Sequence, residues 1–186
     1  MTNDIRNLLA ARILLLDGGF GTMVQGYGLD EADYRGERFR DWNVQLKGCN
    51  DLLVLTRPDT VREIHEKYLQ AGADIITTDS FNANAVSLAD YGLEPYACEI
   101  ARAAASVARA AADAFTARNP QKPRFVAGSM GPTNRTASMS ADVQNPAARE
   151  VTFAQLVEAY TDQVRGLVDG GADILLLSLI HISEPT

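Results

Sequence analysis

Short apolar runs alternate along this chain with longer segments in which apolar and polar residues recur at helical spacing. The apolar runs lie at residues 13–16, 75–77, 125–127 and 174–177. Each run is too short for a helix and is largely apolar on both faces, which is typical of strands buried in a parallel sheet. The pattern therefore predicts about four parallel strands.

Three amphipathic helices are predicted between these runs. They cover about residues 56–71, 95–117 and 152–169. Gly72 ends the first, since glycine readily adopts the left-handed conformation that terminates helices. The second is rich in alanine, the best helix former. Thr152 and Gln155 have the spacing of a capping box, which predicts the start of the third.

The junctions between helix and strand nearly repeat. Residues 71–76 (AGADII) and 170–175 (GGADIL) both indicate a helix end, a tight turn and a strand start. A recurring αβ unit predicts the α/β fold class with right-handed crossovers. The pattern fits both a closed barrel and an open, doubly wound sheet. Because no Gly-x-Gly-x-x-Gly motif follows the first strand, a nucleotide-binding open sheet is unsupported.

A polar segment of about residues 26–50 separates the first strand from the first of these helices. It contains Tyr27, Tyr34, Phe39 and the only tryptophan, Trp42. Aromatic side chains of this size need apolar surface to pack against. We therefore predict an ordered excursion rather than a linker.

Composition narrows the class of protein. The 186 residues suffice for one domain but are few for a complete (β/α)8 barrel, which usually takes about 250. The net charge of −7 disfavours nucleic acid as a partner. Neither a signal peptide nor a membrane-spanning run is found, so no membrane partner is expected. Cys49 and Cys98 are expected to be reduced thiols in a cytoplasmic protein.

Polar and glycine-rich residues follow the predicted strands. Asp17, Gly18 and Gly19 end the first run, Thr78 and Ser80 follow the second, and residues 128–134 follow the third. In parallel α/β folds the carboxyl ends of the strands meet at one mouth. There Asp17 can accept hydrogen bonds or face an ammonium group, and glycines allow close approach to the backbone. These groups predict a site for a small zwitterionic ligand.

Structural interpretations of the same residues stay open. Asp17 alternatively caps the following turn, Thr78 and Ser80 alternatively belong to a turn, and residues 128–131 alternatively form only a tight loop. His65 is interpreted as a surface histidine rather than a catalytic base. Two separated histidines and two separated cysteines argue against a metal site within this chain.

Longer motifs point to a known family. Residues 17–23 (DGGFGTM) and 78–82 (TDSFN) resemble the first and second strand ends of the homocysteine S-methyltransferase family. Residues 32–53 and 127–138 resemble, in particular, the N-terminal homocysteine-binding domain of the cobalamin-dependent methionine synthases in that family. The resemblance runs from about residue 13 to residue 177, which we take as one domain, 1–177.

The resemblance implies a (β/α)8 TIM barrel of which about the first four βα units are present. It implies that homocysteine is bound, that zinc activates its thiol, and that a methyl group passes from methylcobalamin to give methionine. It further implies that folate- and cobalamin-binding modules are partners of this domain in the parent chain. Asp17, Gly18, Gly19, Thr78 and Ser80 match its substrate-binding positions.

The sequence departs from the family in two respects. The family's three zinc cysteines lie on later strands, and neither Cys49 nor Cys98 matches them. Ser178 stands where the family has a glutamate that holds the substrate's amino group, and Glu184 lies too far along to replace it. We therefore interpret residues 178–186 as a non-family tail, from truncation or read-through. No catalytic residue is identified in this chain, which alone is expected to be unstable and inactive and to bind no cofactor.

Two other functions remain as alternatives. One is a homocysteine methyltransferase that uses another donor, such as S-methylmethionine or betaine, which the length of the parent chain would distinguish. The other is a non-catalytic half-barrel that dimerises through its open edges.

Overall fold

The computed structural model describes residues 5–137, 144 and 147–177. The described α-helices are α1 (Ile5–Ala11), α2 (Phe20–Gln25), α3 (Glu31–Arg35), α4 (Leu53–Thr56), α5 (Pro58–Ala71), α6 (Ala85–Leu88), α7 (Ala97–Arg118) and α8 (Phe153–Asp169). The remaining elements are the 3₁₀ helices η1 (Asn50–Leu52), η2 (Ala89–Tyr91) and η3 (Glu94–Tyr96), and the strands β1 (Ile75–Thr77), β2 (Phe125–Met130) and β3 (Ile174–Leu177). Ser178, His181 and Glu184, and with them the predicted tail, lie outside the described residues, as does Ser138.

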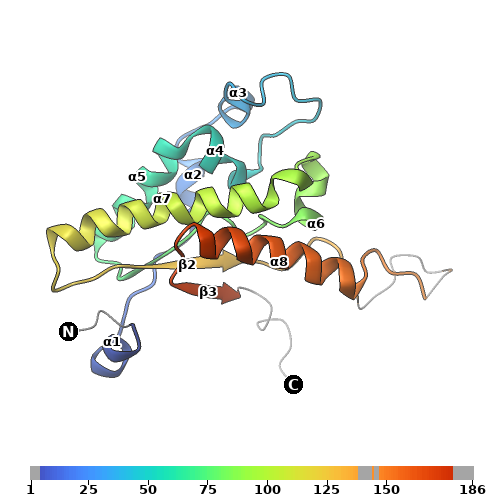
Figure 1. Ribbon diagram of the computed structural model, residues 1–186. Coiled ribbons are helices and arrows are strands. Elements are labelled where there is room, and N and C mark those ends of the chain that lie inside the picture. Colours follow the sequence, from blue (N-terminus) through green and yellow to red (C-terminus); the bar gives the residue numbers. More distant parts are fainter. Residues whose placement is uncertain (1–4, 138–143, 145–146, 178–186) are drawn as a thin grey trace.

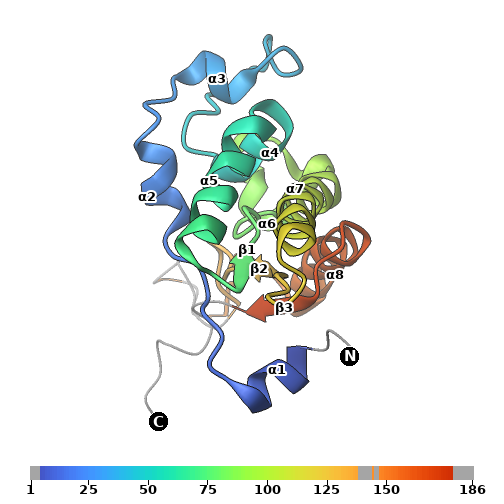
Figure 2. The same ribbon diagram turned by 90° about the vertical axis from the view of Figure 1, so that its left-hand side faces the viewer.

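The three strands form one parallel sheet in the order β1-β2-β3. Ile75 is in register with Phe125, and Ala127 with Ile174. The helices α5, α7 and α8 lie in an arc outside these strands, whereas α1 lies apart from them (Figures 1 and 2). A parallel sheet covered by the helices that connect its strands confirms the predicted α/β fold class.

The first predicted strand is not formed as a strand in the described chain. Of residues 13–16, only Leu16 makes a bridge, to Ile75, in parallel orientation. The run lies at the edge of the sheet, where Ile13 is 85% and Leu15 56% exposed. The backbone hydrogen bonds between this segment and the neighbouring strand involve Leu15 and Asp17 and reach only Asp74 and Ile75, so the ladder is limited to one bridge. The predicted count of four strands is therefore not confirmed.

At each of the two repeated junctions, residues 71–76 and 170–175, an aspartate forms a hydrogen bond with the neighbouring chain segment. The Asp74 carboxylate accepts a hydrogen bond from Leu15 N at 3.0 Å, and Asp173 accepts one from Val126 N at 2.8 Å. In each case an arginine from a neighbouring segment pairs with the carboxylate. The repeated Ala-Asp sequence thus has a structural reason: its carboxylate satisfies a backbone donor of the adjacent chain segment.

The long helices follow the sequence closely. Pro58–Ala71 ends at Gly72, whose φ of 114° lies in the left-handed region. Thr152 and Gln155 form the predicted capping box at the start of α8. α7 begins two residues after the expected start. Local propensity and capping therefore determine these boundaries.

Glycines in α8 allow it to pack unusually close to α7. A Cβ atom at Gly166 would clash with the backbone carbonyl of Cys98, and one at Gly170 with that of Arg102. The facing side of α7 is built of buried alanines such as Ala101 and Ala105. Small residues on both helices let the backbones approach, and the helices run side by side in Figure 1.

The predicted excursion is ordered and its aromatics pack, as expected. The rings of Phe39, Trp42 and Tyr96 form edge-on contacts, with centroids 5.3–5.9 Å apart. Trp42 Nε1 also donates a hydrogen bond to the Tyr91 carbonyl at 2.8 Å. These contacts anchor residues 26–50 against the segment that leads into α7.

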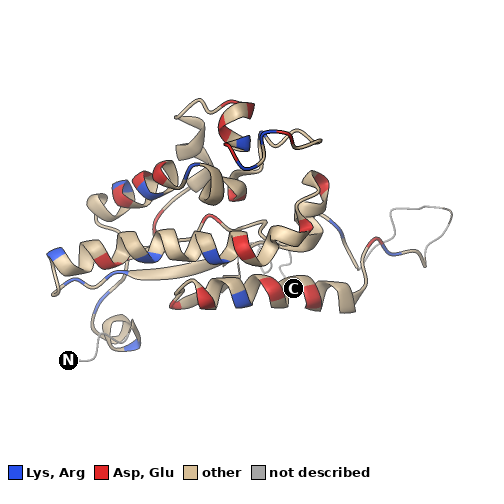
Figure 3. Ribbon diagram, turned by 45° about the horizontal axis from the view of Figure 1, so that its top comes forward, with Lys and Arg blue, Asp and Glu red and all other residues tan. Residues whose placement is uncertain are grey.

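Acidic and basic residues are interspersed along the outer helices (Figure 3). Several form pairs one helical turn apart, such as Glu63 with Lys67 at 2.9 Å. In the described residues, no helix combines the length and the apolarity needed to cross a membrane.

Candidate functional site

A cavity of about 430 Å³ lies where the carboxyl ends of the strands meet. It is lined by residues 16–21, 50–51, 77–79, 81–82, 129 and 176. Segments that are far apart in the sequence therefore form one site. Asp17, Thr78 and Ser129, each from a different predicted strand end, all lie in its wall. We call it the strand-end cavity.

The side chain of Asp17 is held against β1 by two hydrogen bonds. Its carboxylate accepts from Thr77 N at 2.8 Å and from Thr77 Oγ1 at 2.9 Å. Burial raises the pKa of Asp17 to about 6, although the hydrogen bonds from Thr77 act in the opposite direction. The carboxylate is thus oriented by the neighbouring strand and stays available to the cavity through its remaining lone pairs.

The two glycines after Asp17 bring the backbone to the cavity wall. Tyr68 donates a hydrogen bond from its hydroxyl to the Gly19 carbonyl at 3.0 Å. A Cβ atom at Gly18 would lie 3.2 Å from the Tyr68 ring. Gly18 therefore has little room for a side chain, and the loop presents its backbone to the cavity.

Thr78 and Ser80 tie β1 to β2. Their hydroxyl oxygens are 2.6 Å apart, and Ser80 Oγ donates to the Ser129 carbonyl at 2.8 Å. Ser129 N donates in turn to Thr78 Oγ1 at 2.9 Å. Thr78 lines the cavity, whereas Ser80 is fully buried behind the wall. The predicted contact of Ser80 with substrate stays a prediction, and the observed contacts of its hydroxyl are internal.

The glycines after the third apolar run contribute to packing. A Cβ atom at Gly128 would lie 3.0 Å from a Leu167 methyl group, and one at Gly131 would clash with the Phe81 ring. Neither glycine lines the strand-end cavity. Gly128 lies inside β2, which runs to Met130, and only Gly131 follows the strand. The alternative that residues 128–131 form a tight loop is therefore wrong for residues 128–130.

The wall also contains two carboxyl groups that the sequence analysis did not single out. Asp51 lies in η1 and Asp79 two residues after the end of β1, and both are buried. Burial raises the pKa of both, and the charge of Asp51 adds to the effect at Asp79. Asp79 lies in the polar segment 78–82 that follows the second predicted strand. That position could have identified it as a candidate site residue.

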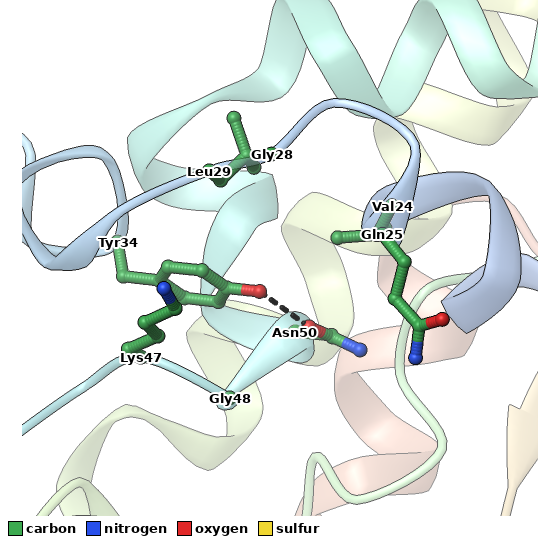
Figure 4. A pocket seen from close by; sticks show the side chains of 8 residues that line it. All are labelled: Val24, Gln25, Gly28, Leu29, Tyr34, Lys47, Gly48 and Asn50. Atoms are coloured by element: carbon green, nitrogen blue, oxygen red, sulfur yellow. Dashed lines mark hydrogen bonds between the residues drawn. The ribbon is translucent and has the colours of Figure 1, made fainter.

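A second cavity of about 470 Å³ shares Asn50 with the first. Figure 4 shows the Tyr34 ring and Asn50 pointing toward one another, with Gln25 on the other side of Asn50. Tyr34 donates from its hydroxyl to Asn50 Oδ1 at 2.7 Å. Asn50 lines both cavities, and Tyr34 of α3 holds it in place through this hydrogen bond.

The prediction that His65 lies at the surface is wrong. His65 is fully buried, and its ring packs against Phe20 with centroids 5.5 Å apart. Burial lowers its pKa to about 4, so it is neutral at pH 7. In the described part of the chain, neither ring nitrogen has a hydrogen-bond partner. Val61 and Leu69, one turn before and after, are also buried, and this spacing was the missed signal.

The described residues do not fit a zinc site. Cys49 is buried, Cys98 is half-buried, and neither lines the strand-end cavity. Burial raises the pKa of the Cys49 thiol, which disfavours the thiolate that zinc requires. Within the described ranges, no group of three or more His, Cys, Asp or Glu side chains is placed to hold a metal ion.

Comparison with known proteins decides the family. Residues 14–183 match homocysteine S-methyltransferase, and this match covers most of the chain. The chain belongs to the homocysteine S-methyltransferase family. The match extends past residue 177, and our domain boundary at that residue stays a prediction.

Solved structures of homocysteine methyltransferase MmuM from Escherichia coli are similar to this family member. The oxidized form is 29% identical, with a TM-score of 0.67, over 94% of this chain and 56% of that one. The metallated form is 27% identical, with a TM-score of 0.68, over 93% of this chain and 56% of that one. The chain thus spans about half the length of the structures it matches.

Proposed function

We propose that this chain forms the homocysteine-binding part of a methyltransferase. The observation that carries the proposal is the strand-end cavity, because it gathers the motifs that resemble the family's substrate-binding segments. Its size suits an amino acid, and its walls combine carboxyl groups with the rings of Phe20 and Phe81. Such walls favour a small ligand with one charged and one apolar end.

In this proposal Asp17 and Gly18 contact the amino-acid part of homocysteine. Asp17 accepts a hydrogen bond from the ammonium group, which is oriented because Thr77 fixes the carboxylate. Gly18 and Gly19 let the ligand approach the backbone. Thr78 shapes the adjoining wall, and Ser80 holds Thr78 in place through its hydroxyl.

The complete enzyme is proposed to be a (β/α)8 barrel that transfers a methyl group from methylcobalamin to the homocysteine thiolate. In such an enzyme zinc lowers the pKa of the thiol. The described residues do not fit that zinc site, so no step through zinc is derived from them. The proposal of methylcobalamin, and of neighbouring folate- and cobalamin-binding modules, is supported by the resemblance of residues 32–53 and 127–138 alone.

Isothermal titration of the purified chain with L-homocysteine tests the proposal. Binding at a one-to-one ratio is expected, and Asp17→Asn is expected to weaken it about tenfold or more, because a charge-assisted hydrogen bond is lost. Asp59→Asn, on the exposed side of α5, is the matched control. Absence of binding, or equal binding by Asp17→Asn, would contradict the proposal.

The expected inactivity of this chain has its own test. Methionine formation from L-homocysteine and methylcobalamin, with zinc added, is expected to stay at the rate of the protein-free mixture. The reason is that the described residues line the proposed substrate cavity but include no group of His, Cys, Asp or Glu side chains that could hold a metal ion. Turnover above that background would contradict this part of the proposal.

A further inference from the structure

Asp51 and Asp79 place two buried carboxyl groups in the wall of the strand-end cavity. Asp51 is 4% exposed and Asp79 7%. They come from different elements, since Asp51 lies in η1 and Asp79 follows β1. The fold thus brings two acids together in an environment where a carboxylate is poorly solvated.

The two carboxyl groups differ in their hydrogen bonds. Asp51 Oδ1 accepts from Asn82 N at 2.8 Å. Asp79 Oδ2 is buried and has no hydrogen-bond partner among the described residues. The ionised form of Asp51 is therefore stabilised by a hydrogen bond, whereas no hydrogen bond to Asp79 Oδ2 offsets the cost of burying an ionised Asp79.

No positive charge compensates the pair within the described part of the protein. The residues that line the cavity there include neither Lys nor Arg. The other titratable groups whose charges interact with the pair are Tyr34 of α3, Cys49 and Tyr91 of η2, and all three are neutral when protonated. The remaining carboxyl group in the wall is that of Asp17. The pair therefore needs either a proton or a cation from outside.

We infer that the Asp51–Asp79 pair receives the ammonium group of an amino-acid ligand and releases one proton to solvent when that ligand binds. The inference rests on the proposed function of the cavity and identifies further groups that recognise the substrate. An ammonium group has three N–H donors, so it can hydrogen-bond to the pair and to Asp17 together.

Charge and protons balance in this step. Without ligand, Asp79 carries the proton and Asp51 is ionised, so the pair has one negative charge. When the ammonium group enters, Asp79 loses its proton to water and becomes a second carboxylate. Two negative charges and one positive charge leave the same net charge, while each carboxylate gains a positive neighbour. The net buried charge is therefore unchanged, and the attraction between the ammonium group and the two carboxylates offsets the desolvation of the two added charges.

Titration calorimetry at pH 8, in buffers with different heats of ionisation, counts the protons released. At this pH Asp17, with a pKa of about 6, is already ionised and contributes little. L-Methionine, which has no thiol proton, is used as the probe, with EDTA present. Release of about one proton per ligand is expected. 4-(Methylthio)butanoate, which lacks the ammonium group, is expected to release none.

One near-isosteric variant assigns the proton to Asp79. Asp79→Asn leaves the Asp51 carboxylate, which accepts from Asn82 N and stays ionised, so the release is expected to fall from about one proton to about zero. Asp59→Asn, an exposed substitution, is expected to release as much as the unmodified chain. Unchanged release in Asp79→Asn would overturn the inference.

A spectroscopic measurement on the unmodified chain tests the inference even if the variants fail to fold. Carboxyl ¹³C resonances of the unmodified chain at pH 7 are expected to include one protonated acid, which disappears when L-methionine is added. A fully ionised pair before ligand is added would overturn the inference.

L-Homocysteine and butylamine separate this inference from the proposed function. Homocysteine binding without proton release would leave the function standing and refute the role of the pair. Butylamine binding with release, but no homocysteine binding, would support the pair and refute the function. Absence of binding by every amine would contradict both.

Discussion

Asp17 of the strand-end cavity is expected to make the free energy of unfolding depend on pH. Its carboxyl group has an ordinary pKa of 3.8, and burial raises the pKa to about 6 in the folded chain. The folded state therefore holds this proton more tightly than the unfolded state. The resulting stabilisation is complete below about pH 4 and is lost as the pH rises through 6.

Replacement of Asp17 by Asn is expected to remove this pH dependence. Between pH 4 and 6.5, the free energy of unfolding of the unmodified chain should fall by about 1–3 kcal/mol more than that of the variant. Urea denaturation at both pH values measures the difference. Parallel curves for the two proteins would show that Asp17 titrates normally.

Asp74 has the opposite behaviour because it is paired. Hydrogen bonds from Arg12 lower its pKa to about 2, so its contribution is present above about pH 4 and is lost as the pH falls toward 2. Asp74→Asn at pH 7 is expected to cost about 2–4 kcal/mol of unfolding free energy, because the amide keeps one acceptor oxygen, faces the remaining donors with its own NH2 group and removes the charge opposite Arg12.

Asp113→Asn is the control for Asp74. Its side chain is 68% exposed and pairs with Arg109 across one helical turn. Exposed pairs of this kind contribute about 0.5 kcal/mol or less. Urea denaturation at pH 7 should therefore separate the two variants clearly, and a similar loss in both would contradict the role assigned to the junction aspartate.

At the scale of elements, the close contact between α7 and α8 depends on glycine. Gly166→Ala is expected to lower the free energy of unfolding by about 1–3 kcal/mol, since the new methyl group meets the backbone of α7. Gly21→Ala, in α2, is the matched substitution. Its Cβ would find its nearest neighbour at 3.8 Å, so helix propensity should stabilise the chain by up to about 1 kcal/mol.

Thermal unfolding of these two glycine variants gives a direct comparison. The same chemical change should move the midpoint in opposite directions, because one site is filled by a neighbouring helix and the other has space. Equal shifts would mean that helix propensity, rather than packing of α7 on α8, dominates at Gly166.

At the scale of the whole molecule, apolar residues remain exposed along one helix and at the edges of the sheet. Phe153 is 79% exposed, Val157 50% and Leu177 54%. Patches of this kind and unpaired edges favour association. The chain alone is therefore expected to self-associate as its concentration rises.

Sedimentation velocity tests this expectation. Phe153→Ser together with Val157→Ser should reduce the associated fraction, and the free energy of unfolding should change by less than about 0.5 kcal/mol because the side chains are largely exposed. Asp59→Asn should leave association unchanged. A monomer at all concentrations in the unmodified chain would contradict the expectation.

The sequence by itself determined the features that depend on neighbouring residues. The capping box at Thr152, the helix end at Gly72 and the alanine-rich α7 follow from local propensity and hydrogen bonds within a few residues. The order of helices and strands also follows from local period, which is why the α/β class was predictable.

Only the tertiary structure decided which way a polar side chain points and which distant groups meet. It directed the Ser80 hydroxyl to Ser129, and it placed Asp51 and Asp79 in the wall of one cavity. It also left residues 13–16 as a bridge rather than a strand. These outcomes depend on segments that lie tens of residues apart, and local sequence preferences carry no information about such contacts.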